Sequence, residues 1–146
     1  DLHSFPTRRS SDLWQIADSG LKNAREHFRQ NDSTHIMENI IYNELRCRGY
    51  DVDVGSIYRT RASDGKRERI GCEVDFVANR GNERVYIQSA YRMDGDVEKR
   101  ERRPYLSLKD SFRKIIVTMD GGKRRYDVDG IERIGLIEFL MDSESI

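Results

Sequence analysis

The chain has 146 residues, with 26 basic and 26 acidic side chains and therefore a formal net charge of zero. This length suits one domain with its own core rather than two, and the balanced charge excludes a whole-chain field that would attract nucleic acid or an anionic membrane. Two cysteines, Cys47 and Cys72, exclude a disulfide scaffold and favour a reduced, cytoplasmic protein. No apolar run approaches the roughly 18 residues of a membrane span.

Residues 1–33 are predicted to lie outside the folded domain. Asp1–Leu13 clusters serine and arginine around a proline and has neither a helical nor a strand period. This segment resembles the translation of a short-read sequencing adapter, so we expect a foreign or disordered tail. Residues 14–33 are a linker or the end of a preceding region, with a short helix predicted at Leu21–Phe28. Trp14 is the candidate for apolar surface against which a preceding domain packs.

The first element of the domain is a helix predicted at Thr34–Arg48, because its apolar residues recur at spacings of three and four. Gly49 follows as the C′ glycine that ends the helix. A strand is predicted at Tyr50–Tyr58, where valine alternates with aspartate. The next segment is strongly polar and is predicted to be a loop. Its five cations are Arg59, Arg61, Lys66, Arg67 and Arg69.

A β-hairpin is predicted at Ile70–Tyr91, with its turn at Asn79–Arg84. Its alternating pattern places Asp75 in the middle of a strand that otherwise looks buried. Burial of an unpaired carboxylate is costly, so this residue needs a partner. The apolar face of this strand is predicted to consist of Ile70, Cys72, Val74, Phe76 and Ala78.

A charged helix is predicted at Asp94–Leu108, interrupted by Pro104, and Phe112–Met119 is predicted to be a buried strand. The remaining predictions are a turn at Asp120–Gly122, short strands at Arg125–Val128 and Ile131–Ile134, and a short helix at Gly135–Met141. From residue 34 the order is therefore helix, three strands, helix and strand. This order predicts an α/β fold, with a mixed sheet flanked by helices.

The αβββαβ order resembles the core of the PD-(D/E)XK, or restriction-endonuclease-like, fold, and the domain is assigned to residues 34–146. The resemblance implies a helix glutamate, a mid-strand aspartate and an (Asp/Glu)-x-Lys strand around one or two Mg²⁺ ions. Glu38 matches the helix acid and Asp75 the strand acid. Gln88 stands where the second acid belongs, and Ala90 where the lysine belongs. A migrated lysine would have to come from the following helix region, at Lys99 or Lys109.

A closer resemblance covers roughly residues 15–146, on the segments HIMENIIYNELRCRGYDVDVG, EVDFVA, YIQSAY, LSLKDSFRKIIVT and DGIERIGLIEFL. These segments are similar to a C-terminal domain of unknown function found behind bacterial and archaeal AAA-type ATPases. The resemblance implies a missing ATPase domain in cis. The present chain has no P-loop, because Gly121-Gly122-Lys123 lacks both the upstream glycine and the serine or threonine. ATP is therefore expected only in the missing upstream domain.

The favoured hypothesis is a non-catalytic recognition or regulatory module, in which Asp75 hydrogen-bonds to Gln88 or to the N-terminal turn of the first helix. Glu38 then complements the helix macrodipole. One alternative is a Mg²⁺-dependent nuclease that uses Glu38 and Asp75 with Gln88 as a supporting ligand. Another is a nucleic-acid-binding module that uses the Arg59–Arg69 segment. A protein partner fits the favoured hypothesis.

Two further runs of charge are interpreted as solvated surface. Lys99, Arg100, Arg102 and Arg103 are interleaved with Glu98 and Glu101 and are predicted to form an ion-paired helix surface. Lys123–Arg125 is interpreted as a loop run of the same kind.

Overall fold

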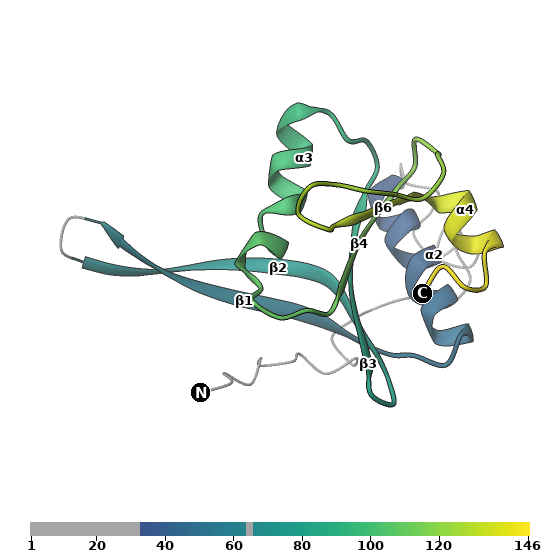
Figure 1. Cartoon of the computed structure of the whole chain (residues 1–146), viewed down its shortest axis with the longest axis horizontal. Helices are drawn as coiled ribbons and strands as arrows, with labels where there is room; N and C mark the ends of the chain where they lie inside the picture. The colour runs from purple at the N-terminus through teal and green to yellow at the C-terminus, as the bar shows by residue number, and fades with distance from the viewer. Residues whose placement is uncertain (1–32, 64–65) are drawn as a thin grey trace, which may run out of the picture.

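The computed structural model describes residues 33–63 and 66–146, and of residues 57–63, 66–70 and 72 it describes the backbone alone. The predicted tail, the linker, the short helix at 21–28 and Trp14 lie outside the described residues. Within them, a six-stranded sheet is flanked by helices (Figure 1). In chain order the elements are α2 Ser33–Cys47, β1 Asp51–Ser63, β2 Lys66–Arg80, β3 Glu83–Ala90, α3 Gly95–Arg102, the 3-10 turn η2 Tyr105–Ser107, β4 Arg113–Thr118, β5 Arg125–Tyr126, β6 Glu132–Gly135 and α4 Leu136–Met141.

The strand order across the sheet is β1-β2-β3-β4-β6-β5. The first three strands form an antiparallel meander, and β4 pairs in parallel with both β3 and β6. The parallel β3–β4 pair requires a crossover, which α3 and η2 provide. The predicted order of helix, three strands, helix and strand is confirmed, and so is the mixed α/β fold class.

Helix α2 forms because its buried side chains Met37, Ile41 and Leu45 recur every four residues and face the sheet. Its end is set by Gly49, which has a φ of 83°. The Gly49 and Tyr50 amides donate to the carbonyl groups of Arg46 and Leu45, each at 3.0 Å. This is the Schellman arrangement, so the predicted C′ glycine is confirmed.

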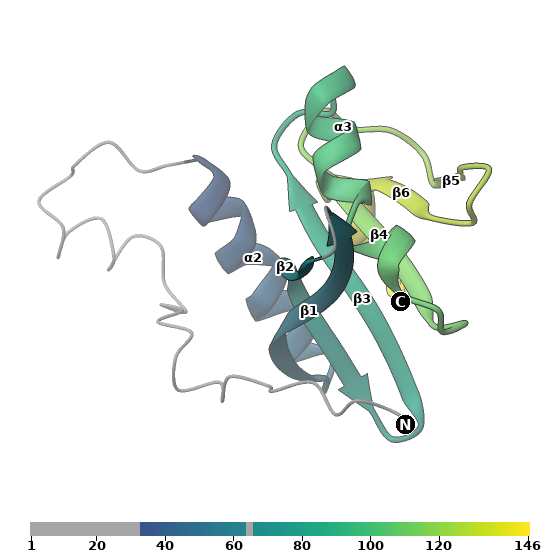
Figure 2. The ribbon, with the colours of Figure 1, turned by 90° about the vertical axis from the view of Figure 1, so that its left-hand side faces the viewer.

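The sheet separates two groups of buried side chains, and Figure 2 shows α2 and α3 on opposite sides of it. The larger cluster packs α2 and α4 against one face and includes Phe76, Ile87 and Ile115. The smaller cluster, on the face covered by α3 and η2, includes Tyr86 and Ile116. The middle strands are therefore buried on both faces, as continuous apolar runs predict.

The single alternation predicted along β2 is wrong, because the side-chain pattern reverses between Val74 and Phe76. Phe76 and Ala78 belong to the larger cluster, whereas Val74 belongs to the smaller one. The cause is a shift in the pairing of β1 with β2. Two residues of β2, at positions 75 and 76, stand there opposite one residue of β1. Such a bulge reverses the side-chain pattern on its far side.

The segment predicted as a loop at Arg59–Arg69 is mostly strand, which corrects the sequence interpretation. Strand β1 continues to Ser63 and β2 begins at Lys66, and the two stay paired up to this last position. Strand β3 pairs with β2 only over Phe76–Arg80. The far part of the β1–β2 hairpin therefore extends away from the other strands (Figure 1). Polarity alone suggested a loop, but inter-strand hydrogen bonding is independent of side-chain polarity.

The second half of the chain follows the prediction with shorter elements. The charged helix ends at Arg102, and Pro104 precedes the separate turn η2, because proline cannot continue the hydrogen bonding of a helix. The two predicted C-terminal strands are present as β5 and β6, although β5 has only two residues. No helix in the described ranges has the length and apolarity to cross a bilayer.

The double glycine has a structural role in this fold. Gly121 and Gly122 have positive φ angles of 69° and 136° and turn the chain after β4. The Gly135 amide donates to the Gly122 carbonyl at 3.1 Å. A Cβ atom at Gly135 would lie 2.7 Å from the Cα atom of Gly121, so both chain segments need glycine here.

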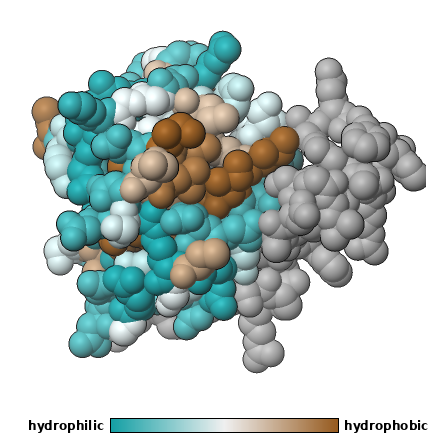
Figure 3. Space-filling view, turned by 90° about the vertical axis from the view of Figure 1, so that its right-hand side faces the viewer, coloured by the Kyte–Doolittle hydropathy of each residue, from teal (hydrophilic) through white to brown (hydrophobic). Residues whose placement is uncertain are grey.

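Helix α4 leaves part of its surface apolar and uncovered by the described residues. Ile137 is 70% exposed and Met141 is 82% exposed. Figure 3, viewed from the side on which α4 lies, shows hydrophobic side chains grouped on a mostly hydrophilic surface. Exposed apolar groups of this kind are typical of surfaces that contact other proteins.

Candidate functional site

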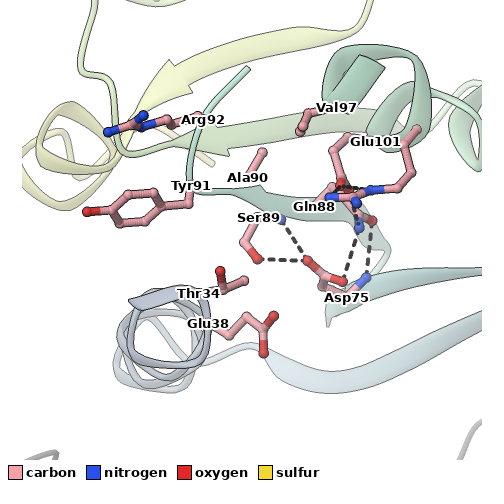
Figure 4. A pocket seen from close by; sticks show the side chains of 11 residues that line it. Thr34, Glu38, Asp75, Gln88, Ser89, Ala90, Tyr91, Arg92, Val97 and Glu101 are labelled. Carbon is pink, nitrogen blue, oxygen red and sulfur yellow. Dashed lines mark hydrogen bonds and ion pairs between the residues drawn. The ribbon is translucent and has the colours of Figure 1, made fainter. Parts of the chain in front are cut away.

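A cavity of about 370 Å³ lies where α2, the bulge of β2, the end of β3 and α3 meet. It contains the three site residues predicted from the sequence, Glu38, Asp75 and Gln88, together with Glu101 (Figure 4). Each of these comes from a different element. The fold therefore brings together side chains that are up to 63 positions apart in the sequence.

Asp75 lies where the β2–β3 ladder ends. The last paired residues are Phe76 and Ile87. Beyond them, the Ser89 amide and hydroxyl both donate to Asp75 Oδ2 at 2.8 Å. The Asp75 amide donates to Gln88 Oε1 at 3.3 Å. Side-chain oxygens thus accept the backbone N–H groups that the separating strands leave unpaired.

The Gln88 amide bridges two carboxylates inside the cavity. Its Nε2 donates to Asp75 Oδ1 at 3.1 Å and to Glu101 Oε2 at 2.8 Å. The hydrogen bond predicted between Asp75 and Gln88 is therefore confirmed. A neutral amide nitrogen with two protons satisfies two acids that would otherwise repel each other. In a metal-dependent site of this shape, a cation would perform the same task.

Glu101 is the member of the site that the sequence interpretation missed. It is only 7% exposed, although the pattern placed it on an ion-paired helix surface. Its Oε1 does accept from Arg100 at 2.8 Å, but its Oε2 points into the cavity. Val97, four residues earlier and the one apolar residue of α3, lines the same cavity. The i, i+4 relation of this valine to Glu101 was the signal available in the sequence.

Burial raises the pKa of the Asp75 carboxyl from its ordinary 3.8 to about 6. The Ser89 hydrogen bonds oppose this change, while the negative charges of Glu38 and Glu101 add to it. Loss of solvation disfavours the charged form of an acid, and nearby like charges have the same effect. Asp75 therefore gains a proton near pH 6.

Glu38 is held more loosely than the other acids. Its side chain is 26% exposed, and its Oε2 lies 3.2 Å from Nδ1 of His35, one turn earlier in α2. Its carboxylate points toward Asp75 in Figure 4. The His35 side chain is 63% exposed.

None of the described residues that line the cavity is a lysine. Neither candidate for a migrated lysine, Lys99 or Lys109, is among the described residues that line it. The lining cations are Arg92 and Arg100, and Arg100 is paired with Glu101. Ala90 lines the cavity at the position where the nuclease pattern requires lysine.

Asp75 and Glu101 already use their oxygens as hydrogen-bond acceptors within the cavity. Both Asp75 oxygens and both Glu101 oxygens already accept hydrogen bonds from N–H or O–H donors. A cation would have to displace the Gln88 amide from between them. Over residues 33–63 and 66–146, no group of three or more His, Cys, Asp and Glu side chains has the arrangement of a metal site.

The cations proposed for nucleic-acid contact lie in the extended part of the β1–β2 hairpin. Arg59 and Arg61 belong to β1, where they stand opposite Ile70 and Glu68 of β2. Lys66, Arg67 and Arg69 belong to β2. Their side chains lie outside what the structure describes, so this hypothesis stays a prediction.

No family model matches the chain. An uncharacterized protein of Haemophilus influenzae (strain ATCC 51907 / DSM 11121 / KW20 / Rd) is 31% identical over 128 residues. The matched region is 86% of this chain but 28% of the relative. The chain therefore spans less than a third of the length of the protein that it resembles.

Proposed function

We propose that this domain is a non-catalytic recognition or regulatory module of a larger AAA-type ATP-binding protein. The observation that carries the proposal is the Gln88 amide, which donates from one nitrogen to both Asp75 and Glu101. A nuclease of this shape would hold a divalent cation against these acids and would use a lysine to activate water. Here an amide stands between the acids and Ala90 replaces the lysine.

Two observations support the proposal that this domain belongs to a larger protein. The Haemophilus influenzae relative continues well beyond the matched region, which is 28% of its length. The exposed apolar residues Ile137 and Met141 of α4 form a surface suited to contact with another domain. An ATPase domain in cis, a cytoplasmic location and a role in controlling ATP hydrolysis are parts of the same proposal. ATP itself would bind to the other domain.

The alternative function is a Mg²⁺-dependent nuclease that uses Glu38 and Asp75. A cleavage assay separates the two. The purified chain is incubated with plasmid DNA in 10 mM-range Mg²⁺ or Mn²⁺, roughly ten times a typical millimolar affinity. We expect no cleavage above that of the metal-free control. Metal-dependent cleavage that Asp75→Ala abolishes would overturn the non-catalytic proposal.

A gain-of-function variant makes a negative result informative. Gln88→Glu combined with Ala90→Lys restores the acid and the lysine of the nuclease pattern. We expect Mn²⁺ to raise the melting temperature of this double variant, because an ion on the rebuilt acids stabilises the native state by mass action. The wild-type melting temperature should not respond. The conservative pair Gln88→Asn and Ala90→Ser serves as the control, since it adds no ligand charge.

A further inference from the structure

A second cavity, of about 150 Å³, lies between α3, β4 and the β5–β6 hairpin and has no part in the proposed function. Three arginines line it, namely Arg102, Arg125 and Arg133. Two acids, Glu98 and Asp127, and Tyr126 also line it. Arg102 belongs to α3, Arg125 to β5 and Arg133 to β6, so their spacing in the sequence does not indicate that they lie together.

Glu98 and Asp127 both form ion pairs with Arg102. Arg102 Nη2 lies 3.1 Å from an oxygen of Asp127 and is also paired with Asp129, and its Nη1 lies 3.6 Å from Glu98. Arg102 therefore has three acidic partners. Neither of these two acids forms an ion pair with Arg125 or Arg133.

Arg125 and Arg133 lie directly opposite each other in the antiparallel β5–β6 pair. Like charges at opposed positions destabilise a sheet. Among the described residues, neither guanidinium has an ion pair or a side-chain hydrogen bond. The neighbouring Arg124, by contrast, pairs with both Glu132 and Asp142. At this edge of the sheet, two guanidinium groups without a described ion-pair partner thus lie at one cavity.

Arg133 also carries a buried donor without a partner. Its Nε is inaccessible to solvent and makes no hydrogen bond. A buried N–H without an acceptor costs free energy, and such groups are rare in folded proteins. An oxyanion in the cavity would reduce the repulsion between Arg125 and Arg133 through its negative charge.

We propose that this cavity binds a phosphate group. A guanidinium presents two parallel N–H donors to phosphate oxygens, which suits a pair of arginines that lack carboxylate partners. A volume near 150 Å³ holds a group about as large as benzene, so it has room for one phosphate and not for a whole nucleotide. Tyr126 is 64% exposed beside the arginines.

The test is calorimetric titration of the full chain with sodium phosphate, at constant ionic strength maintained with sodium chloride. We expect saturable binding by the wild type and about tenfold weaker binding by Arg125→Gln, because one charge-assisted hydrogen-bonding partner is lost. Arg125 is exposed, so this substitution should leave the fold intact. Arg125→Lys keeps the charge but loses the paired donors, and should lie between the two.

Lys123→Gln is the matched control, since it removes the same charge two positions earlier without lining the cavity. We expect it to bind phosphate as the wild type does. Equal weakening in Lys123→Gln and Arg125→Gln would reduce the effect to general electrostatics and would overturn the proposal. Absence of saturable phosphate binding by the wild type would also overturn it.

The phosphate could belong to a free small molecule or to a polynucleotide backbone, and a second arm distinguishes these sources. A fluorescent 12-residue oligothymidylate is titrated with the protein, and then inorganic phosphate is added at constant ionic strength. Displacement by phosphate that Arg125→Gln weakens assigns the site to the nucleic-acid backbone. Phosphate binding without oligonucleotide binding at this site assigns it to a small phosphate compound.

Discussion

The two cavities beside α3 differ in whether their charged side chains have partners. Around Asp75, three acidic side chains converge, and the described partners satisfy the oxygens of both Asp75 and Glu101. Around Arg133, a cross-strand pair of arginines has no described acidic partner, and one guanidinium nitrogen is buried without an acceptor. In the acidic cavity the oxygens of Asp75 and Glu101 thus have described partners. In the arginine cavity the guanidinium groups of Arg125 and Arg133 do not.

This difference indicates where a ligand adds stability. A ligand at the acidic cavity must first displace hydrogen bonds that already stabilise the fold, which lowers its net affinity. An anion beside Arg125 and Arg133 would displace no described partner of these two side chains and would reduce the repulsion between them. We therefore expect the residues that resemble a nuclease site to bind a ligand less readily than the arginine cavity does.

The largest effect is expected from Gln88→Glu. The substitution replaces the bridging amide with a third buried carboxylate beside Asp75 and Glu101. We expect a loss of about 4 kcal/mol in the free energy of unfolding at pH 7, as for a buried charge left unpaired. Urea denaturation measures it. Asn82→Asp, which adds the same charge in an exposed turn, should change stability little. Equal effects of the two substitutions would mean that the amide bridge contributes nothing specific.

The second effect concerns pH. Because the pKa of Asp75 is about 6 in the folded state and ordinarily 3.8, the folded protein holds the extra proton between these values. Stability due to this group is therefore greatest below pH 4 and falls as pH rises to about 6, by about 3 kcal/mol at about 1.4 kcal/mol for each pH unit.

Unfolding measured in urea from pH 4 to pH 7.5 checks this slope, with Asp75→Asn as the reference. The variant cannot titrate at this position, so its stability should fall less steeply over the same range. Parallel curves for the two proteins would show that Asp75 does not titrate near pH 6.

The third effect tests the arginine cavity without a ligand. Arg125→Glu turns the repulsive pair with Arg133 into an attractive one. We expect a gain of up to about 1 kcal/mol in phosphate-free buffer, the usual range for a cross-strand charge pair. Thermal denaturation at low salt measures it. Lys123→Glu makes the same charge change away from Arg133, and a similar gain in that variant would contradict the proposed repulsion.

The smallest effect is expected at the rim of the acidic cavity. Glu38→Gln removes an exposed pair with His35, so stability should change by about 0.5 kcal/mol or less. The substitution also removes one of the charges that raise the pKa of Asp75, so the Asp75 titration should move to lower pH. NMR titration of the Asp75 carboxyl measures this shift. An upward movement would show that Glu38 does not act on Asp75 through its charge.

Much of the architecture is predictable from local pattern. The repeat of apolar residues in α2, its end at Gly49 and the interruption of the charged helix before Pro104 all depend on interactions within a few residues. The order of elements follows from those patterns. The hydrogen bond of Asp75 to Gln88 is predictable because both occupy facing strands of one hairpin, and a buried acid needs a partner.

Three features depend on the tertiary structure. The bulge at Asp75 depends on how β1 is aligned with β2, and alternation within one strand cannot reveal a shift between two. Glu101 enters the acidic cavity because α3 crosses the sheet at one particular rotation. Arg125 and Arg133 become neighbours only when β5 folds back on β6. Local sequence determines the type and period of each element, whereas long-range pairing decides which charges meet, and at both cavities that pairing sets the chemistry.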